Sequence, residues 1–342
     1  MTKRQIIKLI LEGKEPPYVP WSFRFTQKAE AALVAHYFTN DIRSVIGNHI
    51  IELGSDFGIF TQLDENHFQD AFGVIWDRSV GKDIGSVSNC VLQTSSLKGF
   101  EFPDPLDKRY FEDILPKIQK YGDCFRLFCI GFSLFERAWT LRGGMENLLT
   151  DFYDAPEFVH ELFEAIADFN IAQIKQALKY DIDAVFFSDD WGQQKGLLMG
   201  YEAWKEFIYP AVMRMYKAVR DDGKYVFIHS CGDVDELFDD LIGIGVHCFN
   251  PFEPGVMDVD VIMNNYRSRL AFWGGLSMNT TASLGSYHKL IDQARHLIEM
   301  GRQGGYILSP SHFIEADTPI ENTLALIEVC KSQKNYKKRL YF

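Results

Sequence analysis

Short apolar runs alternate with helical patterns along this chain of 342 residues. Eight of the runs have the length and composition of strands, and helical periodicity follows each of them. The expected strands occupy residues 18–23, 45–53, 125–130, 184–188, 225–229, 247–250, 270–274 and 305–309. Strands separated by helices pair in parallel, because parallel neighbours need a crossover of about a dozen residues or more. The sequence therefore predicts an α/β fold, and eight repeats favour closure into a single (β/α)8 TIM barrel.

The helical pattern is clearest at residues 155–180, where apolar side chains form one stripe. Similar patterns cover residues 202–220, 233–243, 258–266, 286–302 and 319–331. An open doubly wound sheet is the alternative arrangement of the same repeats. However, no expected strand is followed by the glycine-rich phosphate loop of nucleotide-binding folds. The barrel is therefore the favoured architecture.

A long segment after the second expected strand exceeds what the minimal repeat requires. About residues 53–106 are expected to form an insertion, because no strand-and-helix repeat accounts for them. On the carboxyl side of a barrel, such an insertion forms a lid or a wall of the substrate site. We find no linker-like segment and no internal repeat, so residues 1–342 are expected to form one domain.

Composition excludes several classes of partner and location. The net charge of −12 argues against nucleic acid and against an anionic membrane surface. No apolar run approaches the roughly 18 residues of a membrane-spanning helix. The N-terminal residues predict a short amphipathic helix rather than a signal peptide. The six cysteines form no C-x-x-C pair, as expected of reduced thiols in a cytoplasmic protein.

Histidine and cysteine side chains that can bind a metal stand at or just after the ends of two expected strands. His229 is the last residue of the fifth strand, and Cys231 comes two residues later. His312 follows the eighth strand. The carboxyl ends of barrel strands meet at one mouth, so these three side chains are expected to supply the three protein ligands of a catalytic zinc. The alternative is a buried histidine and an inert thiol, with His312 in an ordinary loop.

Two adjacent carboxylates follow the fourth expected strand. Asp189 and Asp190 cannot both face one way in an extended segment, so one is expected to cap the following loop and the other to enter the cavity. Asp190, Asp189 or Glu253 is the expected fourth zinc ligand. Asp190 is also a candidate for proton transfer. Both carboxylates forming turns is the alternative.

Charged and aromatic residues near other strand ends are candidates for substrate contact. Asp56 follows the second strand and is a candidate catalytic carboxylate. Arg24 follows the first strand, where it would suit an anionic group of a substrate. A surface salt bridge is an equal alternative for Arg24. The aromatic candidates suit a flat apolar ligand, although core packing explains such residues as well. They are Trp21, Phe57, Trp191 and Trp273.

Four segments resemble the uroporphyrinogen decarboxylase superfamily. They are residues 189–199, 229–233, 272–276 and 304–312. The resemblance covers the C-terminal half well and the N-terminal half loosely. It implies a single (β/α)8 barrel and a homodimer. The superfamily includes true decarboxylases and zinc-dependent methyltransferases that act with corrinoid proteins.

The site pattern is closer to the methyltransferase branch. His229 and Cys231 match the His-x-Cys pair of that branch, and His312 stands where its distant cysteine would be. A histidine there makes the zinc site harder and less anionic, which weakens the case for thiol activation. True decarboxylases carry several arginines after the first strand, whereas this chain has only Arg24 there. It keeps the segment around Asp56, which resembles the substrate-binding aspartate of that branch.

The resemblance implies a zinc-dependent methyltransferase. A methyl group would pass from a small substrate, for which a methoxylated aromatic compound is one candidate, to a corrinoid held by a separate protein. This reaction would be an O-demethylation in which zinc polarises the departing oxygen. One alternative is a metal-free decarboxylase, with Arg24 anchoring the substrate and Asp56 as the polar centre. Another is a non-catalytic binding protein on a reused barrel.

Overall fold

The computed structural model describes residues 1–55, 58–80, 84–277 and 287–339, with the backbone alone for residues 334–339. The chain divides into two compact units. The first unit comprises Met1–Ile51, Asp123–Phe125 and His247–Phe342. The second unit comprises Glu52–Gly122 and Arg126–Val246. Both contain parallel strands and helices, so the predicted α/β class is confirmed. The closed eight-stranded barrel and the single domain stay predictions.

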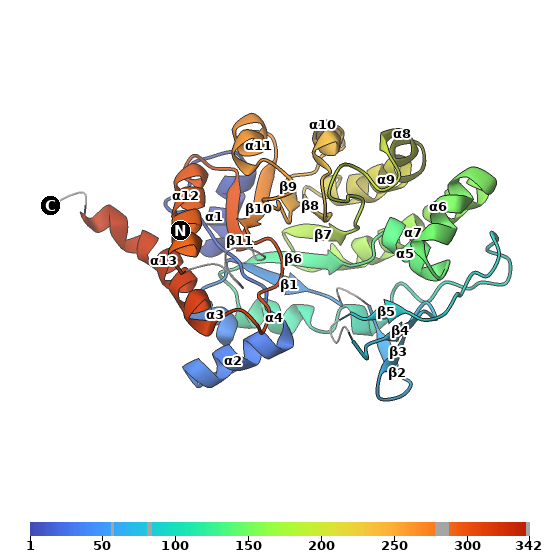
Figure 1. Cartoon of the computed structure of the whole chain (residues 1–342), viewed down its shortest axis with the longest axis horizontal. Coiled ribbons are helices and arrows are strands. Elements are labelled where there is room, and N and C mark those ends of the chain that lie inside the picture. The colour runs from blue at the N-terminus through green and yellow to red at the C-terminus, as the bar shows by residue number, and fades with distance from the viewer. Residues whose placement is uncertain (56–57, 81–83, 278–286, 340–342) are drawn as a thin grey trace. The chain divides into compact units, whose positions relative to one another are not determined.

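The second unit is built on three parallel strands, which lie side by side in Figure 1. They are β6 (Phe125–Ile130), β7 (Ala184–Ser188) and β8 (Tyr225–His229). All six residues of β6 are buried, as expected of a central strand covered on both faces. The register pairs Cys129 with Phe186 and Phe187 with Ile228. All three strands lie within one residue of the ranges expected from the sequence.

Helices precede, connect and follow these strands. They are α4 (Ile114–Lys120), α5 (Phe135–Leu141), α6 (Met145–Asp154), α7 (Pro156–Ala177), α8 (Tyr201–Ala203), α9 (Tyr209–Arg220) and α10 (Phe238–Gly243). The short helical turns are η1 (Lys108–Tyr110), η2 (Trp204–Ile208) and η3 (Asp235–Leu237). The continuous helix expected at residues 202–220 is broken by η2, a π-helical turn. Pro210 lacks the N–H that a regular helix would direct at residue 206, which favours a wider turn there.

The segment expected as an insertion forms an antiparallel sheet. Its strands are β2 (Phe60–Gln62), β3 (His67–Asp70), β4 (Ile75–Asp77) and β5 (Ser86–Val87), paired in that order. The buried Trp76 of β4 packs on Phe132, which follows β6, with ring centroids 4.9 Å apart. The role of this segment as a lid stays a prediction.

The first unit has its own parallel strands, β9 (Cys248–Asn250), β10 (Ala271–Leu276) and β11 (Tyr306–Pro310). Its other elements are α1 (Lys3–Leu11), α2 (Gln27–Tyr37), α3 (Ile42–Ile46), α11 (Val259–Tyr266), α12 (Tyr287–Gly301) and α13 (Ile320–Arg339). The strand β1 (Ile50–Leu53) begins in this unit. The expected short N-terminal helix is present as α1, and a capping box at Thr2 fixes where it begins.

Two predicted strands differ from the structure. Residues 18–23 form no regular strand; Trp21 and Phe25 instead form isolated parallel bridges to Leu308 and Ile314. Pro20 lacks a backbone N–H, which limits a continuous ladder in this segment. The first two residues of the strand expected at residues 45–53 belong to α3. Asp41 caps that helix and Gly47 ends it at φ 84°, so β1 begins only at Ile50.

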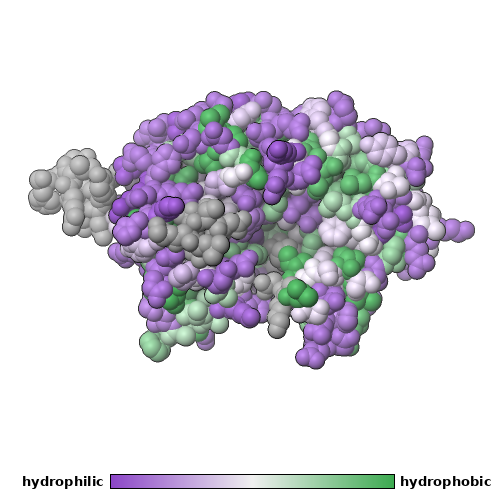
Figure 2. Space-filling view, in the orientation of Figure 1, coloured by the Kyte–Doolittle hydropathy of each residue, from purple (hydrophilic) through white to green (hydrophobic). Residues whose placement is uncertain are grey.

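The surface agrees with the charge of the chain. Hydrophilic residues predominate on the face drawn in Figure 2, and hydrophobic residues occur in smaller groups. Within the described residues, every helix is too short or too polar to cross a membrane.

Candidate metal site after strands β7 and β8

The ends of two neighbouring strands bring the candidate site together. Ser188 of β7 pairs with His229 of β8, and the N–H of Asp189 then donates to the His229 carbonyl over 3.0 Å. The residues that follow each strand therefore leave the sheet at the same level. This register places the loop of Asp190 against the loop of Cys231.

Three side chains in this position offer ligand atoms to one point. His229 Nε2 lies 3.3 Å from Cys231 Sγ and 3.6 Å from Asp190 Oδ1. The Asp190, His229 and Cys231 ligand atoms all lie within 4.8 Å of one another. Asp190 Oδ1 also accepts a hydrogen bond from the Cys231 N–H over 2.8 Å, which ties the two loops together.

The spacing of these donors fits a zinc ion. Ligands about 2.0–2.3 Å from a tetrahedral zinc lie about 3.3–3.7 Å from one another. The distances from the His229 nitrogen to the Cys231 sulfur and to the Asp190 oxygen, 3.3 and 3.6 Å, fall in that range. Nitrogen, sulfur and carboxylate oxygen are all ligands that zinc accepts in proteins. The donor set is therefore compatible with zinc without a large rearrangement.

Two glycines allow the loops to approach closely. Gly232 has φ +81°, and a Cβ on it would lie 2.3 Å from the backbone carbon of Gly192. A Cβ on Gly192 would lie 2.6 Å from the Cys231 carbonyl oxygen. Backbone bonds hold this contact, from Gly192 N–H to the Cys231 oxygen (3.2 Å) and from Asp233 N–H to the Gln193 oxygen (2.7 Å). Only residues without a side chain permit this geometry at both positions.

The two adjacent carboxylates point to different partners. Asp189 is buried and accepts backbone hydrogen bonds from Leu134, Phe135 and Glu136 at the start of α5. The Trp191 indole also donates to Asp189, over 2.7 Å. Asp189 thus fixes the loop before α5, and Asp190 is left to the candidate metal site. Burial raises the pKa of Asp189 to about 6, against the opposing effect of these donors.

A further acid beside the site was missed in the sequence. Glu136, in the first turn of α5, has its pKa raised well above the usual value by burial and then by the negative charges of Asp190 and Asp189. It also accepts a hydrogen bond from the Asp190 N–H. The signal in the sequence was an acid six residues beyond a buried strand, but spacing alone did not connect it to Asp190.

The first unit holds other predicted site residues. His312 Nε2 lies 3.3 Å from Glu253 Oε2, so these two form an imidazole–carboxylate pair. The Arg24 guanidinium lies 5.6 Å from the ring centroid of Trp273 and 5.2 Å from that of Phe313. A cation over aromatic faces is favourably placed. A zinc-ligand role for His312 and an anion-binding role for Arg24 stay predictions.

Several aromatic candidates are buried. Trp21, Trp191 and Trp273 are each at most 1% exposed. Their indole N–H groups donate to Ile46, Asp189 and Ser22, respectively. Each therefore packs inside its own unit, and substrate contact by any of them stays a prediction. Asp56 and Phe57 lie outside the described residues.

Comparison with known proteins places this chain among enzymes of one family. The profile of the family described as Uroporphyrinogen decarboxylase (URO-D) matches residues 90–333. A methylated-thiol–coenzyme M methyltransferase from Methanosarcina mazei is 26% identical over 188 residues, which cover 55% of this chain and 48% of that protein. A uroporphyrinogen decarboxylase from Anaeromyxobacter dehalogenans is 26% identical over 189 residues, covering 54% and 51%. The chain thus spans about half the length of these relatives.

A solved structure agrees over nearly the whole chain. A methyltransferase from Methanosarcina mazei superposes with a TM-score of 0.76 at 17% identity, covering 97% of this chain and 99% of that one. At this identity the likeness shows a shared fold. The sequence relatives named above are a methyltransferase and a decarboxylase.

Proposed function

The chain belongs to the uroporphyrinogen decarboxylase family, and on that premise we propose that it is a zinc-dependent methyltransferase. Its methyl donor would be a small substrate, with a methoxylated aromatic compound as the candidate, and its acceptor a corrinoid held by a partner protein. The observation that carries the proposal is the group of Asp190, His229 and Cys231, in which the His229 nitrogen lies 3.3 and 3.6 Å from the other two donor atoms, distances that suit zinc ligands. The similarity to a methyltransferase over half the chain supports it.

The residues of the second unit would each contribute to the site. His229 and Cys231 would bind the metal from the end of β8, and Asp190 would add an oxygen ligand from the end of β7. The hydrogen bond from the Cys231 N–H to Asp190 holds the carboxylate in place before any metal binds. His312 is the proposed further ligand. A bound zinc would act as a Lewis acid on a substrate oxygen or sulfur and make it a better leaving group.

The surrounding residues would fix this geometry. Asp189 secures the start of α5 through three backbone hydrogen bonds, so Glu136 stays beside Asp190. Gly192 and Gly232 keep the two loops in backbone contact. Such support matters, because a zinc site tolerates errors of only about 0.2 Å in ligand distance.

Zinc analysis tests the proposal directly. The protein is expressed with added zinc, and metal content is measured by mass spectrometry for wild type and for Cys231→Ser, Asp190→Asn and His312→Ala. Wild type should hold about one zinc per chain, and Cys231→Ser should hold little. Cys90→Ser is the matched control, because Cys90 is another half-buried free thiol and lies outside the donor group. Wild-type protein free of zinc after this treatment refutes the metal site.

Methyl transfer is then measured with reduced corrinoid and a series of methyl ethers and thioethers. The absorbance change of the corrinoid on methylation reports the reaction, and wild type should show it where Cys231→Ser does not. Equal rates in both proteins contradict a role for zinc in the transfer.

Decarboxylation of a carboxylated substrate is the second candidate. The similarity to uroporphyrinogen decarboxylases favours it, as does the position of Arg24 over two aromatic rings, where a carboxylate could pair with it. In that case Cys231→Ser should leave the rate of carbon dioxide release almost unchanged, whereas Asp56→Asn should abolish it. The two variants therefore distinguish the two functions.

A further inference from the structure

A cavity in the second unit is separate from the donor atoms of the candidate metal site. It encloses about 350 Å³ of empty space, its opening to solvent included. Residues at the end of β6, one face of α7 and the antiparallel segment line it. Because that figure counts space open to solvent, the room between the walls is smaller still. The cavity would therefore hold a compact ligand.

Aromatic rings form much of the wall. The ring of Phe169 meets that of Phe72 edge-to-face at 4.9 Å and that of Tyr110 at 6.4 Å. Phe132 lines the cavity from the end of β6 and stacks on Trp76. Rings held by one another in this way present fixed apolar faces and edges. Such walls favour a planar aromatic ligand.

The charge inside the cavity is already balanced. Arg137 reaches the wall from α5, but its guanidinium pairs with buried Asp70 over 2.6 Å and stacks on Phe72 at 4.2 Å. Asp70 in turn accepts hydrogen bonds from the Trp76 indole and from the backbone of Phe72 and Val74. The pair leaves no unmatched positive charge for an anion. An uncharged ligand is therefore favoured.

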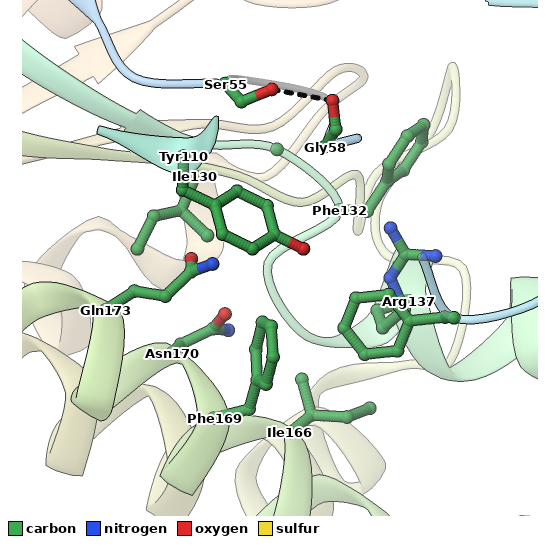
Figure 3. A pocket seen from close by; sticks show the side chains of 12 residues that line it. Ser55, Gly58, Tyr110, Ile130, Phe132, Arg137, Ile166, Phe169, Asn170 and Gln173 are labelled. Atoms are coloured by element: carbon green, nitrogen blue, oxygen red, sulfur yellow. Dashed lines mark hydrogen bonds between the residues drawn. The ribbon is translucent and has the colours of Figure 1, made fainter. Parts of the chain in front are cut away.

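Three polar side chains point into the space. Figure 3 shows the Tyr110 hydroxyl and the amides of Asn170 and Gln173 directed into the same cavity. All three residues are at most 5% exposed. Among the described residues, neither the Tyr110 hydroxyl nor the Gln173 amide has a hydrogen-bond partner, whereas the Asn170 nitrogen donates to the Ser133 carbonyl. Buried polar groups of this kind are normally paired.

The hydroxyl of Tyr110 would act as a donor. Burial raises the pKa of Tyr110 to about 12, so it stays protonated across the physiological range. The Gln173 amide offers both a donor and an acceptor. Together they match an oxygen substituent on a ring, which accepts from the Tyr110 hydroxyl and from the Gln173 N–H; a phenol O–H can in addition donate to the Gln173 carbonyl oxygen.

We propose that this cavity binds an uncharged single-ring aromatic compound with an oxygen substituent, a phenol or its methyl ether. Helix α5 connects the cavity to the candidate metal site, because Arg137 lines the cavity while the adjacent Glu136 lies beside Asp190. The identification of this compound as the methyl donor rests on the proposed function. The binding itself does not depend on zinc.

Calorimetric titration with four probes tests the binding. Phenol and methoxybenzene should bind, toluene should bind about tenfold more weakly because it leaves the hydroxyl and the amide unpaired, and benzoate should not bind measurably. The proposal is overturned if toluene binds as tightly as phenol, if benzoate binds most tightly, or if none of the four compounds binds wild-type protein.

Variants locate the binding in this cavity. Tyr110→Phe and Gln173→Leu should each weaken phenol binding about tenfold and leave toluene binding unchanged. Tyr153→Phe is the matched control, since Tyr153 is 84% exposed, and it should bind phenol like wild type. Thermal melting verifies that each variant is folded. Unchanged phenol binding in both cavity variants contradicts the assignment.

One further variant separates this inference from the proposed function. Cys231→Ser should bind phenol with wild-type affinity, and Tyr110→Phe should retain full zinc. If wild type binds phenol but holds no zinc, the cavity stands and the methyl-transfer mechanism fails. If it holds zinc but binds none of the probes, the cavity assignment fails alone.

Discussion

Replacing Gly232 by alanine tests whether the contact between the loops after β7 and β8 builds the site. The new Cβ would lie 2.3 Å from the backbone carbon of Gly192, whereas ordinary contacts begin at about 3.4 Å. The loops must therefore separate by roughly 1 Å, far more than the 0.2 Å that ligand distances tolerate. We expect zinc affinity to fall at least tenfold, because Cys231 precedes Gly232 directly.

The cost in stability is worked from the same geometry. An alanine at φ +81° costs about 1–2 kcal/mol in backbone strain. Separation of the loops weakens two backbone hydrogen bonds, each worth about 0.5–1.5 kcal/mol. We expect the free energy of unfolding to fall by about 2–5 kcal/mol in total. Chemical denaturation of the metal-free protein measures this loss independently of zinc.

Gly223→Ala supplies the matched control. Gly223 has φ +68°, in the same unit, but a Cβ on it would meet no atom within 4 Å. Its free energy of unfolding should fall only by the backbone strain of about 1–2 kcal/mol, and it should keep full zinc binding. If Gly232→Ala matches Gly223→Ala in both stability and zinc content, the close approach of the two loops does not build the site.

Three other predictions follow from buried groups. Asp70→Asn leaves the Arg137 charge buried and unmatched, so the free energy of unfolding should fall by about 3–5 kcal/mol; a loss below 1 kcal/mol in urea titration would contradict this. Asp189→Asn removes the carboxylate that three backbone N–H groups share and should cost at least about 2 kcal/mol, measured in the same way. Alkylation at pH 8 followed by peptide mapping should modify Cys231 rapidly and more slowly after zinc is added. Burial raises the pKa of three other thiols, so they hold less reactive thiolate at this pH and should react far more slowly. These are Cys124, Cys248 and Cys330. Equal rates at all four would refute this reasoning.

The central strands were predictable because burial on both faces leaves a continuous apolar run. The limits of β6, β7 and β8 match the expected strands, and every residue of β6 is buried. The first expected strand failed because an apolar run does not reveal whether its N–H groups find partners. Pro20 in that segment, and the capping of α3 by Asp41 before the second expected strand, are local signals that outweighed hydrophobicity.

Only part of the candidate metal site could be predicted from the sequence. His229 and Cys231 stand two residues apart at a strand end, so the sequence alone joins them. The choice between Asp189 and Asp190 was open, because their roles depend on which backbone donors lie near. The structure decided it through the N–H groups of α5 and the N–H of Cys231.

The sequence by itself determined the α/β class, the central strands, and the position of an imidazole and a thiol at the end of one of them. Tertiary structure decided that Asp190 rather than Asp189 lies beside that pair, and it alone left Tyr110 and Gln173 facing one cavity. The physical reason is that apolar periodicity is a local property of the chain. Convergence of polar groups depends on strand register and on which loops pack together, and both are settled only when distant segments meet.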